Sequence, residues 1–117
     1  MKRNWDTIRK ILVQFEQNSP NPMPEGITKE EFFYHIELLL DKGLIKDCKI
    51  QRYIGGSMYV GDGRLTFDGH DFLDNIRIDT VWSKVKSKIA IAGENVSFAL
   101  IKEIASTAAK SLLEQMY

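Results

Sequence analysis

Apolar residues near the start of the chain recur at steps of three and four positions, which places their side chains on one face of an α-helix. These residues are Trp5, Ile8, Ile11, Leu12 and Phe15. Asn4 precedes them, and an asparagine at this place can cap a helix N-terminus with its side-chain oxygen. The pattern predicts an amphipathic helix from about Asn4 to Gln17.

A second helical pattern follows a loop, residues 18–26, that contains all 3 prolines of the chain. It opens with the capping-box sequence Thr28-Lys29-Glu30-Glu31, in which the Thr28 hydroxyl and the Glu31 carboxylate each satisfy a backbone amide. Its apolar stripe is Phe32, Ile36, Leu39 and Leu40. Gly43 supplies the left-handed residue that ends many helices. We therefore expect a second, capped helix that ends at Gly43.

From Ile45 onward the pattern changes to short stretches rich in isoleucine, tyrosine and valine, separated by glycine turns at 55–56 and 61–63. Such alternation is typical of strands joined by tight turns, so we expect a small antiparallel ribbon of two or three strands. Helical spacing resumes after Thr66, a predicted cap. Residues 66–92 are either one kinked helix or two, with Asp79 as the predicted cap of the second part.

The last apolar stripe follows Ser97, which can cap a further helix. Its members are Ile101, Ile104, Ala105, Ala108, Leu112 and Met116. Phe98, Ala109 and Leu113 widen the apolar surface beyond one narrow face. Residues 97–117 are therefore predicted to form a terminal helix, which either packs on the core or pairs with a second copy in a homodimer.

Composition restricts the class of protein. The 117 residues, 44% hydrophobic and 27% charged, are typical of one globular domain, and we expect residues 1–117 to form it. No apolar stretch approaches the roughly twenty residues that span a bilayer. Charges at Lys2, Arg3, Arg9 and Lys10 interrupt any signal-peptide core, so no membrane partner and a cytoplasmic location are predicted.

Two stretches carry a recognisable pattern: Tyr34–Ile45, a helix with a glycine stop, and Leu65–Leu73, a strand that leads into a helix. Both resemble a winged helix. With Ile8–Leu12 and Arg77–Trp82 added, nearly the whole chain is similar to an uncharacterised family of bacterial, phage and prophage proteins known as a domain of unknown function. The resemblance implies a phage or prophage setting and brings no activity, substrate or cofactor. We expect an α+β, winged-helix-like fold with an N-terminal helix, a capped second helix, a β-ribbon as the wing, and C-terminal helices.

Charge gives mixed indications about nucleic acid. The 16 basic and 16 acidic side chains cancel, so binding to DNA requires a local basic patch. The predicted ribbon offers one, formed by Lys46, Lys49, Arg52 and Arg64. The alternative is an ordinary solvated sheet surface whose lysines protect an edge strand. The second helix carries four carboxylates, at Glu30, Glu31, Glu37 and Asp41, which is the wrong sign for a helix in a major groove.

No arrangement of residues indicates catalysis, a cofactor site or a metal site. His35 lies in an apolar helical pattern and is expected to be a partly buried histidine bonded to backbone. Cys48, His35 and His70 cannot supply the four ligands of a structural zinc site, and a lone cysteine forms no internal disulfide. We therefore expect a non-enzymatic macromolecule-binding module, either a regulatory DNA-binding protein or a protein-interaction module without nucleic-acid binding.

Overall fold

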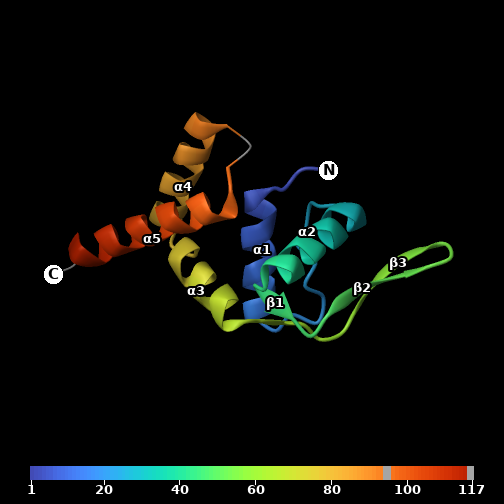
Figure 1. Ribbon diagram of the computed structural model, residues 1–117. Helices are drawn as coiled ribbons and strands as arrows, with labels where there is room; N and C mark the ends of the chain where they lie inside the picture. The colour runs from blue at the N-terminus through green and yellow to red at the C-terminus, as the bar shows by residue number, and fades with distance from the viewer. Residues whose placement is uncertain (94–95, 116–117) are drawn as a thin grey trace. The chain divides into compact units, whose positions relative to one another are not determined.

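A computed structural model describes residues 1–93 and 96–115 of the chain (Figure 1). The chain divides into two compact units, Met1–Asp71 and Phe72–Tyr117. The order of helices and ribbon is the predicted α+β layout. That residues 1–117 fold as a single domain stays a prediction.

Helix α1, Trp5–Glu16, opens the first unit. The side-chain oxygen of Asn4 accepts a hydrogen bond from the Thr7 amide at 3.0 Å, so the predicted cap is confirmed. The five apolar residues of the predicted stripe are all buried. Residues 17–28, which follow, contain no helix or strand, although Pro22 and Pro24 are buried.

Helix α2, Lys29–Lys42, has both of its predicted ends. At the N-terminus the Thr28 hydroxyl accepts from the Glu31 amide at 3.1 Å, which confirms the predicted cap. The Glu31 carboxylate accepts from the Thr28 hydroxyl at 3.2 Å and not, as predicted, from the Thr28 amide. At the C-terminus Gly43 has a φ of 75°, and the Leu44 amide donates to the Leu39 carbonyl at 3.0 Å. This left-handed stop directs the chain into the ribbon.

The ribbon is one long hairpin that pairs in two places. Near its base β1, Ile45–Lys46, pairs antiparallel with β4, Arg64–Leu65. Further out β2, Lys49–Tyr53, pairs antiparallel with β3, Gly56–Val60. Figure 1 shows β2 and β3 projecting as an arm away from α1 and α2. The predicted antiparallel ribbon is therefore confirmed, with two strands at each level.

Several elements hold the base of the hairpin in the first unit. Helix α1 contacts α2 and β4, and α2 contacts β1 and β2. The apolar residues of α2, β1 and β4 that these contacts bury are Phe32, Ile36, Leu39, Ile45 and Leu65. The helix–helix–ribbon order fits the winged-helix prediction, but residues 17–28 contain no supporting helix. The winged-helix assignment stays a prediction.

Residues 66–92 form two helices, α3, Phe67–Ile76, and α4, Asp79–Ala92. Thr66 caps α3 as predicted, because its hydroxyl accepts from the Gly69 amide at 3.0 Å. The prediction that Asp79 caps α4 is wrong. The N-cap is Ile78, which has no side-chain acceptor, and Asp79 is the first helical residue. A carboxylate in that first turn still suits the positive end of the helix dipole.

The terminal helix α5, Phe98–Gln115, belongs to the second unit and contacts α4. Ser97 caps it through a hydrogen bond from the Leu100 amide at 3.2 Å. Phe98 packs on Phe72 with ring centroids 5.0 Å apart. Of the predicted stripe, Ile101 and Ala105 are buried, and Ile104, Ala108 and Leu112 are half-buried. Met116 lies outside the described residues.

Candidate binding surface

The four predicted nucleic-acid-binding residues lie on the ribbon, but not on one face of it. Lys46 and Arg64 are directly opposite each other in β1 and β4 and both are exposed. Lys49 and Arg52 are three positions apart in β2, so their side chains point to opposite faces. The predicted basic patch is therefore split between the two faces of the ribbon.

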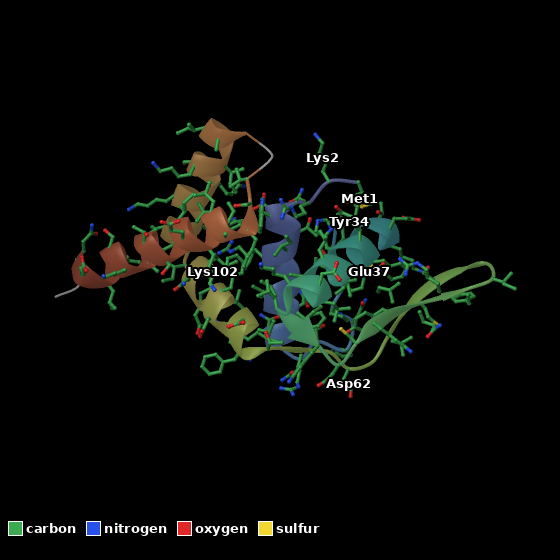
Figure 2. The ribbon with its side chains drawn as sticks, viewed as in Figure 1. Met1, Lys2, Tyr34, Glu37, Asp62 and Lys102 are labelled. Carbon is green, nitrogen blue, oxygen red and sulfur yellow. The ribbon has the colours of Figure 1, made fainter. Side chains whose placement is uncertain are left out.

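Both arginines of this set are paired with carboxylates. The Arg52 guanidinium donates to Glu37 of α2 at 2.6 Å, and the Arg64 guanidinium donates to Asp47 at 2.7 Å. Figure 2 shows Glu37 on α2. Lys46 and Lys49 form no ion pair with any other described residue. Exposed pairs of this kind add only about 0–1 kcal/mol to stability, but they reduce the positive potential that a phosphate backbone would meet.

The outer face of the hairpin carries exposed apolar side chains. Cross-strand partners share a face of a ribbon, so Gln51 lies beside Met58, and Lys49 beside Val60. Tyr53, Met58 and Val60 are 55%, 50% and 36% exposed. Ile54, at the tip, is fully exposed. We call Tyr53, Ile54, Met58 and Val60 the outer hairpin face.

The inner face of the hairpin anchors it to the helices. Ile50 and Tyr59 are directly opposite each other and both are half-buried. The Tyr59 ring packs on Phe32 of α2 and Phe15 of α1, with centroids 5.8 and 6.4 Å apart. The alternation of exposed and half-buried positions in Gly56–Val60 follows directly from this packing. One face is thus fixed on the unit, and the other is left to solvent.

Cys48 and Tyr59 form a small polar contact beneath the hairpin. The pKa of the Cys48 thiol is raised: burial has the largest effect, nearby Asp47 raises the pKa further, and the neighbouring Tyr59 hydroxyl lowers it in part. The pKa of Tyr59 is also raised, first by burial and then by Cys48 and Asp62. Its hydroxyl donates to the Asp62 carbonyl at 3.4 Å, in the turn where Figure 2 labels Asp62. A thiol in this setting is a poor nucleophile at neutral pH.

Alkylation of Cys48 by iodoacetamide is therefore expected to be several-fold slower than that of N-acetylcysteine at the same neutral pH. The raised pKa leaves less thiolate, the reactive species. Tyr59→Phe should slow the reaction further, because it removes the hydroxyl that lowers the pKa of Cys48. Mass spectrometry of timed samples would measure both rates. A rate at or above that of the reference thiol would contradict the expected direction.

His35 has the structural role that its sequence context indicates. Its ring is buried, Nε2 accepts from the Asn4 amide at 2.9 Å, and Nδ1 lies 2.6 Å from the Glu31 carbonyl. The ring is therefore neutral with its proton on Nδ1, because only this tautomer satisfies both backbone groups. The predicted bonding of His35 to backbone is confirmed, and the ring is fully buried where a partly buried one was expected. His70, in contrast, is exposed.

Two other kinds of site are absent from the described residues. Within residues 1–93 and 96–115 no group of three or more His, Cys, Asp or Glu side chains is placed to hold a metal ion. None of the helices in the same residues combines the length and the apolar character needed to span a bilayer. The ribbon brings exposed apolar residues and unpaired cations close together.

Comparison with known proteins gives a family but no activity. The family model described as "Hypothetical protein (DUF2513)" matches residues 2–95. A protein from Haemophilus influenzae, described as "Uncharacterized protein", is 37% identical over 119 residues, which cover 97% of this chain and 99% of that relative. No solved structure matches the chain. The resemblance to an uncharacterised domain family is confirmed by these matches.

Proposed function

We propose that this chain, which belongs to the family described as Hypothetical protein (DUF2513), is a non-enzymatic module that binds another protein through the β2–β3 hairpin. The observation that carries the proposal is the outer hairpin face, where Tyr53, Met58 and Val60 are exposed on a ribbon whose opposite face is packed. Exposed apolar clusters of this kind mark interaction surfaces.

The edge of β3 supports the same proposal. Within the described residues β3 pairs with β2 alone. Exposed edge strands are usually protected by lysine, proline or a bulge, yet Gly56–Val60 contains no charged residue and no proline. An extended segment of a partner can add to such an edge as a further strand, with its backbone hydrogen-bonded to β3.

The charges of the ribbon favour one kind of partner segment. Lys46 and Lys49 flank the hairpin base without an ion pair, so they are available to carboxylates of a bound protein. Apolar side chains of the same segment would cover Met58 and Val60. We therefore propose an extended segment that alternates apolar and acidic residues, bound in a reducing bacterial cytoplasm where Cys48 stays a thiol.

A second candidate function is regulatory DNA binding in a phage or prophage. Lys46 and Lys49 favour it, since unpaired cations on a wing can contact phosphates. Two observations weigh against it: Arg52 and Arg64 already bind carboxylates, and the four basic residues do not share a face. Protein binding is therefore the better supported of the two.

The proposal can be tested with a photo-crosslinking amino acid at Met58, in cells that produce the protein natively. The same group at Ile91, which is also highly exposed, is the control. We expect a protein adduct of defined mass from Met58 and none from Ile91. The identified partner is then purified, and its affinity is measured against the parent and against a Met58→Lys, Val60→Lys variant, which should bind at least about 10-fold more weakly.

Two results would contradict protein binding by the hairpin. One is the absence of any adduct at Met58, and the other is equal affinity of the parent and the lysine variant for the purified partner. Retardation of duplex DNA at low salt would favour the second candidate, provided that Lys46→Glu and Lys49→Glu abolish it and flatten its salt dependence.

A further inference from the structure

A groove of about 690 Å³ lies between α4 and α5, within the unit Phe72–Tyr117. Lys84 and Lys88 line it from α4, and Leu100, Glu103, Ile104 and Ala108 line it from α5. The groove belongs to a different unit from the hairpin and is independent of the proposed function.

The α5 wall of the groove is a single helical stripe. Leu100, Ile104 and Ala108 recur every four residues, so they share a face with Glu103 at their edge. Leu100 is 41% exposed, and Ile104 and Ala108 are half-buried. The inner side of the same helix, with Ile101 and Ala105, is already buried. Helix α5 thus has a covered apolar side and an adjacent apolar stripe that nothing described covers.

The charges of the groove are opposite in sign and unpaired. Lys84 and Lys88 are one turn apart on α4, and Glu103 is on the facing wall, yet none of the three forms an ion pair within the described chain. A second copy of α5 would bring an apolar stripe for Leu100 and Ile104 and a Glu103 for the two lysines. Each copy carries the apolar stripe and both kinds of charge. Two copies related by two-fold symmetry can therefore match stripe with stripe and Glu103 with the two lysines.

We propose that this groove is the interface of a homodimer with two-fold symmetry, in which α5 of each copy lies in the α4–α5 groove of the other. Glu103 of one copy faces Lys84 and Lys88 of the second, and the symmetry repeats this contact. Leu100, Ile104 and Ala108 form the apolar centre between the two charged ends. The small side chain of Ala108 allows the two helices to approach closely.

The symmetry permits a charge-exchange test by light scattering or sedimentation. The parent should be a dimer at high micromolar concentration. Glu103→Lys alone, or Lys84→Glu with Lys88→Glu, places like charges at both ends and should raise the dissociation constant by about 10-fold or more. Lys102→Glu, on α5 but outside the groove, should leave the dimer intact (Figure 2).

An equimolar mixture of the two charge-reversed variants is the decisive sample. In a mixed dimer both ends again join opposite charges, so the mixture should dimerise although each variant alone is a monomer. Ion pairs within a single chain cannot give this result, because each variant alone carries charges of only one sign at positions 84, 88 and 103. Circular dichroism would show that each variant is folded, as expected for changes at solvent-facing positions. A monomeric parent, dimeric single variants or a monomeric mixture would each overturn the proposal.

Discussion

Gly69→Ala is expected to lower the free energy of unfolding by about 3 kcal/mol. In most helices a change from glycine to alanine is stabilising by roughly 0.5–1 kcal/mol. Here the added Cβ would collide with the carbonyl oxygen of Leu44 and lie 3.0 Å from its carbonyl carbon. That carbonyl is a fixed backbone group, because it accepts the Thr66 amide at 3.0 Å. The substitution must therefore move α3 or break this hydrogen bond.

Urea denaturation followed by circular dichroism would measure the change. Asp71→Ala, at an exposed position of the same helix, is the control and should alter stability by no more than about 0.5 kcal/mol. If Gly69→Ala stabilises the protein as it does in an ordinary helix, the close approach of α3 to Leu44 is wrong.

His35→Ala should also cost about 3 kcal/mol, for a different reason. The imidazole fills buried volume and is the acceptor for the Asn4 amide, which precedes α1. Without the ring a cavity remains and that amide loses its partner. The substitution therefore weakens the connection between α2 and the start of α1 as well as the packing.

The exposed histidine is a matched control, since His70→Ala should change stability by at most about 0.5 kcal/mol. Amide hydrogen exchange adds a local measurement. Exchange at Asn4 should be faster in His35→Ala than in the parent, even after correction for global stability. Unchanged protection of the Asn4 amide would show that Nε2 is not its acceptor.

The parts of the fold that the sequence predicts are those governed by near neighbours. Thr28, Thr66 and Ser97 each cap a helix with a hydroxyl three residues from its amide partner, and Gly43 ends α2 through its own backbone angle. Such signals act over one helical turn and are visible in a single sequence. The end of α3 has no such signal. Arg77 and Ile78 include neither glycine nor a side-chain cap, which is why residues 66–92 stayed open between one helix and two.

The candidate site was harder to predict because it depends on contacts between distant residues. The sequence identifies the cations of the ribbon, and their odd spacing puts Lys49 and Arg52 on opposite faces of a strand, but only the structure shows that β2 includes both. The pairing of Arg52 with Glu37 depends on how β2 packs on α2. The exposure of Met58 and Val60 likewise follows from Tyr59 turning inward to Phe32. Each fact requires the tertiary structure.

The two ends of the ribbon are joined independently of its tip. The Thr66 amide donates to Leu44 and the Thr66 hydroxyl to Gly43, while Ile45 pairs with Leu65. The chain between these points is therefore a loop whose two ends are held together, and doubling the length of such a loop costs only about 0.6 kcal/mol of closure entropy. A change of length at the tip, residues 54–55, should therefore cost little stability as long as Tyr59 and Arg52, which anchor the hairpin to the helices, are kept.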